Sequence, residues 1–338
     1  RAVVRVVRHI PPMNRTVVRV HKPGGPEVLT VEQEPAPSPG PGEVQVAQTA
    51  VGLNFIDVYL RSGLYPSPLP FIGGQEGAGV VTELGAGVTT LQVGQRVAYA
   101  GAVGGYASVR VLAADKVIAL PDGISEITAA AIMLKGMTAE YLVRRCHVVK
   151  PGQLVVVHAA AGGVGQLACQ WARHLGATVI GVVGRREKAQ LATESGAHHV
   201  VVLSEQSLVD EVKRLSNGHG ADVVYDSVGK DTLKASLDSL RARGLLVSFG
   251  QSSGMPDPIA LATIGGARSL YITRPSMHAY THTRAELEES SSALFDVVLK
   301  GVVKVKPPTT FPLTEAAAAH RALEARQTTG SVVLLPKV

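Results

Sequence analysis

The chain has 338 residues, of which 46% are hydrophobic, which is enough to bury the cores of two ordinary domains. It has no apolar run near the length of a membrane span, and its net charge of +6, half of it from Arg1, Arg5 and Arg8, gives only weak support for a basic nucleic-acid-binding face. Its cysteines, Cys146 and Cys169, lie outside any C-x-x-C pair, which argues against a disulfide framework or a cysteine zinc site and fits a reducing compartment, the cytoplasm.

The first segment, residues 1–12, reads "RAVVRVVRHIPP" and is rich in arginine and free of acids. Such a composition fits either the remnant of an import signal or an N-terminal extension without a structural role. We favour the extension, because the segment is short and lacks serine, and because Met13 begins a stretch that looks like a natural start.

Short strands and turns are predicted from Arg15 to about Ala114. The stretches "TVVRV" and "EVQVAQTAV" alternate apolar and polar residues, and "AGVVTEL" and "QRVAYA" are further strand candidates. The stretch "PAPSPGPGE" is a turn-rich connection between strands. We expect a compact β-barrel-like domain here.

The pattern changes near Ile127. The stretch "EITAAAIMLKGMTAEYLVRR" has helical spacing, and a series of continuous apolar runs follows it, as is typical of strands covered on both faces. Helical segments are predicted between these runs at 164–175, 185–195, 207–215 and 231–241. Strands that alternate with helices predict a doubly wound parallel sheet.

The end of the chain, from about Pro275, departs from this alternation. We expect two helices, "RAELEESSSALFDVVLKG" and "FPLTEAAAAHRALEAR", the second with Thr314 as a possible N-cap, and a last strand in "GSVVLLP". The simplest arrangement returns the chain to the first domain. We therefore predict one domain from 13–137 and 275–338, with a nucleotide domain at 138–274 inserted in it.

A glycine-rich turn lies between the strand and the helix predicted within 155–177. Its residues 160–165 match G-x-G-x-x-G with Ala160 in place of the first glycine. In this setting Gly162 lets a pyrophosphate approach the backbone, Gly165 lets the helix pack against the strand, and free N–H groups face the anion. The predicted dinucleotide contacts are Ala161, Gly162, Gly163, Val164 and Gly165; the alternative is a turn that serves packing alone.

The end of the second strand indicates which dinucleotide is bound. An NAD site carries an acidic residue there, but this chain has Val183 and Gly184, followed by Arg185, Arg186 and Lys188. Cations without a repelling acid suit a 2′-phosphate, so we expect NADPH, held by Arg185 and Lys188. The alternative is a solvated helix start, although basic residues there oppose the helix dipole.

Several segments together resemble one known family. The stretch "GGQEGAGVVTELGAGV" is similar to the G-H-E-x-x-G region of medium-chain alcohol dehydrogenases, and "AAGGVGQLACQWAR" resembles the fingerprint of their quinone oxidoreductase branch, the zeta-crystallin relatives. The stretches "GLNFIDVYLRSGLYP", "LKGMTAEYL", "VVYDSVGKDT" and "SLYITRPS" are similar to the same branch. The resemblance covers nearly everything after Met13 and implies an α/β protein with a GroES-like β-barrel-like domain and a Rossmann domain.

The chain departs from the wider family at the zinc ligands. Asn54 and Gln75 stand where a zinc enzyme has a cysteine and a histidine, and a neutral amide binds zinc poorly. His158, His198 and His199 are not expected to be ligands, because they lie in or just before predicted strands. We predict no metal site. Without a Lewis acid, an acceptor that needs little activation is favoured, which agrees with the NADPH-dependent quinone reduction that the resemblance implies.

The resemblance also implies residues near the nicotinamide. Asn54, Asp57, Tyr59 and Tyr65 are expected to line the cleft between the domains, where a tyrosine could donate to a quinone oxygen and Asp57 or Asn54 could orient it. The alternative is that "NFIDVY" begins a helix with Asn54 as its N-cap. Thr138 is expected to contact the nicotinamide or its phosphates.

Further cofactor contacts are implied on the nucleotide side. Their candidates are Ser227, Phe249, Gly250, Arg274 and Arg326, the first three because ligands gather at the carboxyl ends of such strands. The family often has a tyrosine where Leu203 stands, and we expect Arg185 to substitute here for that contact to the adenosine phosphate.

The stretch "ARSLYITRP" is predicted to be an edge strand. An unpaired apolar edge favours pairing with a second copy, as the resemblance also implies, so we expect a homodimer. Two other activities stay open: reduction of an activated alkene such as an enone, and binding of AU-rich RNA as an additional role, although aromatic residues are only 4% of the chain. The physiological acceptor, and whether electrons leave singly or as a hydride, cannot be read from the sequence.

Overall fold

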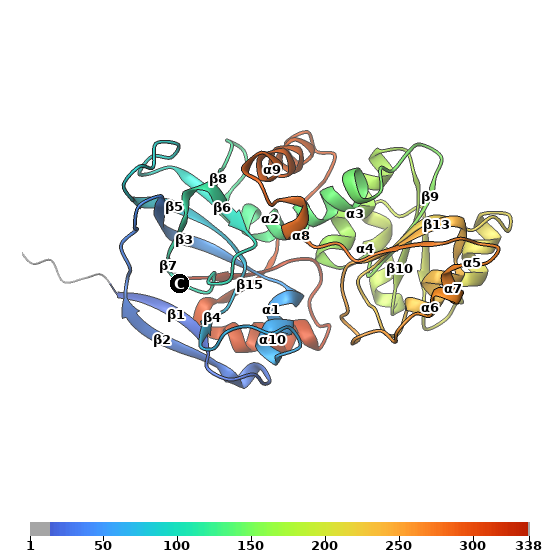
Figure 1. Ribbon diagram of the computed structural model, residues 1–338, viewed down its shortest axis with the longest axis horizontal. Helices are drawn as coiled ribbons and strands as arrows, with labels where there is room; N and C mark the ends of the chain where they lie inside the picture. The colour runs from blue at the N-terminus through green and yellow to red at the C-terminus, as the bar shows by residue number, and fades with distance from the viewer. Residues whose placement is uncertain (1–13, 337–338) are drawn as a thin grey trace, which may run out of the picture.

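The computed structural model describes residues 14–336; the N-terminal extension predicted at residues 1–12 lies outside them. Two sheet systems lie at opposite ends of the elongated molecule, with helices α2 (Glu126–Tyr141) and α3 (Gly163–His174) between them (Figure 1). Within the described residues, no helix combines the length and the apolar character that a membrane crossing requires.

The first sheet system is built by both ends of the chain. A three-stranded sheet has the order β2-β1-β4, and a seven-stranded sheet has the order β15-β16-β3-β5-β6-β8, with β7 paired to β3. Strand β16 near the C-terminus runs antiparallel to β3, so the last strand lies in the same sheet as strands from the first part of the chain. The strands are β1 (Asn14–Val20), β2 (Leu29–Pro35), β3 (Glu43–Leu53), β4 (Phe71–Ile72), β5 (Glu76–Leu84), β6 (Arg96–Ala100), β7 (Val109–Ala113), β8 (Ile118–Ala119), β15 (Thr309–Pro312) and β16 (Val332–Leu335).

The second sheet is parallel and has six strands in the order β11-β10-β9-β12-β13-β14. In chain order within this domain, that is the 3-2-1-4-5-6 arrangement of a Rossmann fold, in which the strand order reverses between β9 and β12. The predicted doubly wound sheet is therefore confirmed. Its strands are β9 (Leu154–His158), β10 (Thr178–Val183), β11 (His199–Val202), β12 (Ala221–Asp226), β13 (Leu240–Ser248) and β14 (Tyr271–Thr273), and its short helices are α4 (Ala189–Glu194), α5 (Leu208–Leu215) and α6 (Leu233–Asp238).

Two predictions of local structure were wrong. The helix predicted at 231–241 ends at Asp238, because Leu240 already pairs with Ala221 in the parallel sheet. Thr314 is no N-cap: it lies inside the short 3₁₀ turn Leu313–Glu315, and α10 (Ala316–Glu324) begins after Glu315 without a side-chain cap. In both places pairing or packing of neighbouring elements overrides the local signal.

Helix α2 joins the two halves. It is buried along most of its length and packs in one hydrophobic cluster with Ala50 and Ala78 of the first system and Val155 and Val157 of the second. The predicted boundary between 137 and 138 falls inside this helix, so the division of the chain stays a prediction. The remaining helices are α1 (Phe55–Ser62), α7 (Leu261–Ile264), α8 (Met277–Tyr280) and α9 (Arg284–Leu299).

Candidate active site

The glycine turn lies at the carboxyl end of β9, where the strand order reverses. Gly162 is the N-cap residue of α3, and its N–H donates to the carbonyl of Ala159 at 2.8 Å. A Cβ on Gly165 would lie 2.2 Å from that carbonyl oxygen, so only glycine permits this close approach of helix and strand. Helix α3 thus directs its free N–H groups at the switch point, as an anion site requires.

The end of the chain closes one side of this turn. Gly330 forms a parallel bridge with Gly162, and its N–H points at the carbonyl of Ala161 at 3.4 Å. Both halves of the molecule therefore contribute to the surroundings of the turn.

A second feature follows β10. Arg185, Lys188 and Arg326 lie close together, and Nζ of Lys188 donates to the carbonyl oxygen of Arg326 at 3.3 Å. Burial lowers the pKa of Lys188, and the charges of Arg326 and Arg185 lower it further. Within residues 14–336 none of the three is found in an ion pair, whereas Arg186 is bonded to Glu205, with Nε 3.1 Å from Oε1. Uncompensated cations of this kind fit a bound phosphate group.

Asn54 takes part in a buried polar cluster where a zinc enzyme would have its first ligand. Nδ2 of Asn54 donates to Oε1 of Glu76 at 2.9 Å, and Nζ of Lys135 donates to the same oxygen at 2.8 Å. The other oxygen of Glu76 accepts from the N–H of Leu134 at 2.6 Å. Glu76 is completely buried, so its charge is balanced inside the protein by Lys135.

Asp57 is buried at the first turn of α1. Its Oδ2 accepts a hydrogen bond from the N–H of Asn54 at 2.8 Å, and Asn54 stands at the N-cap position of α1. Burial raises the pKa of Asp57 to about 7, and the charge of Glu76 adds to the rise. Helix α1 therefore begins after Asn54, as the alternative interpretation of the sequence predicted, and Asp57 caps the helix start through this hydrogen bond.

Tyr59 and Tyr65 meet residues of the nucleotide half. Their rings lie 5.2 Å apart, and the Tyr59 hydroxyl accepts from the N–H of Gln251 at 3.2 Å. Arg274 donates through Nη2 to the Tyr65 hydroxyl at 3.0 Å and to Oε1 of Gln251 at 2.9 Å, and through Nη1 to Oγ of Ser248 at 3.2 Å. Burial raises the pKa of Tyr59. Three of the predicted residues are thus brought together across the two halves.

The other predicted cofactor residues lie at the same edge of the parallel sheet or beside it. Ser227 follows β12, and Phe249 and Gly250 follow β13; a Cβ on Gly250 would lie 2.8 Å from the carbonyl oxygen of Ser227. Thr138 lies in α2 and is buried, and its hydroxyl donates a hydrogen bond to the carbonyl oxygen of Leu134 at 2.7 Å. Leu203 directly follows β11 and is partly exposed.

Sequence reasoning missed Glu76, Lys135, Gln251 and Ser248. Glu76 stands in the quoted "GGQEGAG" and Lys135 in "LKGMT", so the family resemblance could have indicated both. Nothing local marks Gln251 or Ser248, whose roles depend on Arg274 reaching back across the sheet edge.

The donor groups at the zinc positions do not fit a zinc ion. The amide nitrogen of Asn54 is already committed to Glu76, and the Gln75 side chain is buried nearby. No group of three or more histidine, cysteine, aspartate or glutamate side chains converges within residues 14–336. His158 is buried against Ser236, whereas Nδ1 of His198 accepts from the N–H of Val179, so the histidines do not form a site.

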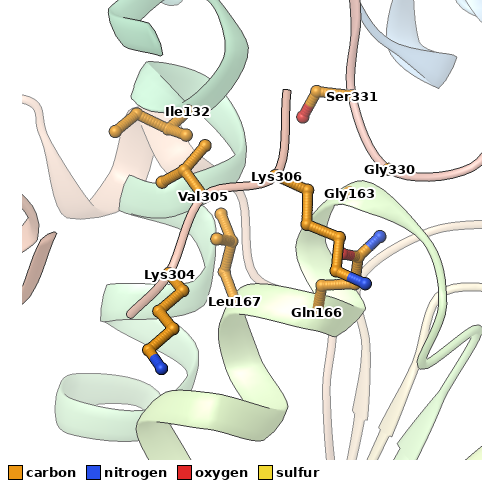
Figure 2. A pocket seen from close by; sticks show the side chains of 9 residues that line it. All are labelled: Ile132, Gly163, Gln166, Leu167, Lys304, Val305, Lys306, Gly330 and Ser331. Atoms are coloured by element: carbon orange, nitrogen blue, oxygen red, sulfur yellow. The ribbon is translucent and has the colours of Figure 1, made fainter. Parts of the chain in front are cut away.

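A small cavity lies behind the glycine turn, between α2, α3 and the segment 304–306 (Figure 2). Its volume is about 20 Å³, which holds one water molecule and no acceptor. Lys304 and Lys306 lie beside it, and the Lys306 ammonium is paired with Glu194. The cavity lies beside the nucleotide turn and is too small to be the substrate site.

Family models, known sequences and solved structures resemble this chain over most of its length. The family models that match are the alcohol dehydrogenase GroES-like domain at residues 40–122 and the zinc-binding dehydrogenase at residues 163–293. The quinone oxidoreductase of Salmonella typhimurium is 50% identical over 326 residues, which is 95% of this chain and 99% of that protein. The 2-haloacrylate reductase of a Burkholderia species is 47% identical over 327 residues, 94% of this chain and 98% of that protein. The crystal structure of Escherichia coli quinone oxidoreductase complexed with NADPH has a TM-score of 0.93 to this chain at 48% identity, covering 95% of this chain and all of the other.

Proposed function

The chain belongs to the medium-chain dehydrogenase/reductase family, among the quinone oxidoreductases, and on this premise we propose that it reduces quinones with NADPH and without zinc. The observation that carries the choice of coenzyme is the group of three cations, Arg185, Lys188 and Arg326, at the end of the second strand of the parallel sheet. A 2′-phosphate would supply the negative charge that this group lacks.

The residues present fit NADPH. The N–H groups of 163–165 at the start of α3 would hold the pyrophosphate, because they have no acceptor among the described residues, and Gly165 allows the helix to start close to the strand. Ser227, Phe249 and Gly250 would border the same crevice. When bound, NADPH supplies the hydride or electrons for the reaction; the protein binds, orients and shields.

The acceptor would lie between the halves, next to Tyr59, Tyr65 and Arg274. Arg274 can donate to an acceptor oxygen in place of Tyr65 or Gln251, and the hydroxyls of Tyr59 and Tyr65, which accept hydrogen bonds in this group, each carry a hydrogen that could be donated to the acceptor. Asn54 and Thr138 border this region in our proposal. A quinone needs positioning more than activation, because the charge of its product is delocalised over the ring.

An activated alkene is the second candidate acceptor. The specific support is the 47% identity to a 2-haloacrylate reductase, a protein whose name describes reduction of a conjugated acid. Steady-state rates with a naphthoquinone, an enone and a 2-haloacrylate separate the two. We expect the quinone to be turned over fastest, and negligible quinone turnover would refute the proposal.

The coenzyme and metal are tested separately. We expect protein fluorescence to report tight binding of NADPH and much weaker binding of NADH. Full activity after treatment with a chelator, together with elemental analysis of the purified protein, tests zinc independence. Stoichiometric zinc in the active protein would overturn that part of the proposal.

We propose a homodimer formed through β14. This strand is the last in the parallel sheet, and Tyr271 on it is 61% exposed, so its free edge can pair with that of a second copy. Sedimentation of the wild type beside Tyr271→Lys tests this; a monomeric wild type would refute it.

Both cysteines are free thiols, which supports a location in the cytoplasm. Binding of AU-rich RNA stays a prediction, and a gel-shift assay with NADPH as competitor would test it.

A further inference from the structure

A chain of polar side chains connects α1 to α10 through the core of the first half. Oδ2 of Asp57 accepts from the Tyr106 hydroxyl at 3.3 Å, and the same hydroxyl oxygen lies 2.9 Å from Nε2 of His320. Nδ1 of His320 lies 3.1 Å from Nη1 of Arg61, and the Arg61 guanidinium pairs with both carboxylate oxygens of Glu324 at 2.8 and 2.7 Å. Tyr106, His320 and Arg61 are buried, and only Glu324 reaches solvent.

Arg61 fixes the direction of the hydrogen bonds from His320 to Tyr106 and from Tyr106 to Asp57. A guanidinium only donates, so Nδ1 of His320 must accept and carries no proton. The ring proton is therefore on Nε2 and is donated to the Tyr106 oxygen, which leaves the Tyr106 hydroxyl hydrogen for Asp57. Burial lowers the pKa of His320 to about 3, and the charge of Arg61 lowers it too, so the ring stays neutral.

The consequence is an asymmetric carboxyl group at Asp57. Its Oδ2 receives two donors, the N–H of Asn54 and the hydroxyl of Tyr106, whereas its buried Oδ1 has no hydrogen-bond partner among residues 14–336. A proton on Oδ2 would oppose both donors, so a neutral Asp57 carries its proton on Oδ1.

Burial, charged side chains and hydrogen-bond donors from several neighbouring elements together set the pKa of Asp57. Burial raises the pKa of Asp57 to about 7; Glu76 of β5 adds to the rise, and the Asn54 N–H, Lys135 of α2 and the Tyr106 hydroxyl oppose it. The carboxyl group can therefore exchange a proton near neutral pH.

We propose that Tyr106, His320 and Arg61 are positioning residues that fix the proton of Asp57 on Oδ1, from which Asp57 protonates the reduced acceptor. This inference rests on the proposed function. Reduction of a quinone to a hydroquinone takes up a hydride equivalent and one proton. The Oδ1–H bond of Asp57 breaks as an O–H bond forms on the acceptor, and Asp57 is left as a carboxylate.

This series of hydrogen-bonded side chains orients the proton transfer and does not itself conduct protons. The Arg61 guanidinium, which lies between Glu324 and His320, only donates hydrogen bonds and has no site that accepts a proton, so no proton passes from Glu324 to His320. The carboxylate left on Asp57 is stabilised at Oδ2 by its two donors, and it must take up a proton from solvent before the next turnover.

The first test needs no variant. Long-range ¹H–¹⁵N correlation spectra of the unliganded protein, labelled at histidine, report the tautomer of His320. We expect protonated Nε2 and unprotonated Nδ1 through the neutral range. The opposite tautomer, or a protonated ring, would overturn the inference.

The second test follows the carboxyl group itself. In protein labelled with ¹³C at the aspartate carboxyl carbon, Asp57→Asn identifies the signal of Asp57, and its titration is compared with that in Tyr106→Phe. Loss of a donor to the carboxylate should raise the titration midpoint of Asp57 by about one pKa unit, a tenfold change in the proton equilibrium. Tyr225→Phe is the matched control, because Tyr225 is also fully buried and its hydroxyl donates to the carbonyl of Leu142.

The pH profile of quinone reduction links the carboxyl group to the reaction. In the wild type we expect kcat to fall as pH rises through the midpoint of Asp57, and in Tyr106→Phe the fall should move to higher pH with unchanged NADPH affinity. An active enzyme whose Asp57 stays ionised at neutral pH, or whose midpoint ignores Tyr106→Phe, overturns this inference alone. A protein with the expected tautomer and titration but no quinone turnover overturns the proposed function, and proton delivery to a quinone with it.

Discussion

The nucleotide cradle, which we define as residues 161–165 with Arg185, Lys188 and Arg326, contrasts with the buried network of Asn54, Asp57, Glu76 and Lys135. In the cradle, among the described residues, the N–H groups of 163–165 have no hydrogen-bond acceptor and the three cations form no ion pair, so a bound anion would supply both. In the network nearly every polar atom is already bonded within the protein. One region is organised to bind and the other to hold groups still, so damage to each should fail in a different way.

The largest effect is expected at the steric basis of the cradle. A Cβ in Gly165→Ala would lie 2.2 Å from the Ala159 carbonyl oxygen and 2.8 Å from Cα of Ala160, so helix and strand must separate. We expect a loss of about 4 kcal/mol or more in the free energy of unfolding, together with loss of NADPH binding. Gly184→Ala, where a Cβ meets nothing within 4 Å, is the control and should change stability by less than about 0.5 kcal/mol. Equal effects in both variants would contradict the steric account.

The network should fail through its buried charge. Lys135→Met leaves Glu76, which is completely buried, without its cation, and we expect a loss of about 3–5 kcal/mol in denaturant unfolding. Lys234→Met breaks the exposed pair with Asp238 and should cost less than about 1 kcal/mol. Adding Glu76→Gln to Lys135→Met should recover part of the loss. If Lys135→Met is as mild as Lys234→Met, the network is not held by this pair.

A third prediction concerns the pH dependence of stability. Asp57 has a pKa of about 7 when folded and an ordinary value of 3.8, so between these values the folded protein binds more protons and its stability falls as pH rises. Asp57→Asn removes this dependence and keeps an acceptor for the Asn54 N–H. We expect the variant to gain on the order of 4 kcal/mol over the wild type at pH 8 relative to pH 4, since about three pKa units separate the two values. Parallel stability curves for the two proteins would show that Asp57 does not titrate in this range.

The smallest expected effect lies at the cations of the cradle. Lys188→Ala should weaken NADPH binding by roughly tenfold and leave NADH binding nearly unchanged, since only NADPH carries the 2′-phosphate. Arg186→Ala is the control, because Arg186 is bonded to Glu205 and stands outside the three cations. Fluorescence titration with both coenzymes measures these affinities. Equal losses for NADPH and NADH would place Lys188 elsewhere on the coenzyme.

The same contrast explains what could be predicted. The glycine turn, the missing acid at the end of the second strand and the strand–helix alternation are local patterns, and the parallel sheet with its 3-2-1-4-5-6 order confirms the fold that they indicate. The helix limits near Asp238 and Thr314 were predicted wrongly, because sheet pairing and a 3₁₀ turn decided them. For the site residues, the structure brings Tyr59, Tyr65 and Arg274 together, while their roles stay predictions.

The sequence by itself determined the family resemblance, the Rossmann turn, the preference for NADPH and the departure from zinc ligands, because each depends on residue types at short, fixed spacing. Only the tertiary structure decided that Asn54 and Lys135 both donate to Glu76. It also brought His320 into contact with Arg61, 259 residues away in the sequence, and with Tyr106, 214 residues away. Such contacts form where distant segments fold against each other in a buried space. There each donor must find an acceptor inside the protein, and no local pattern specifies which acceptor it will be.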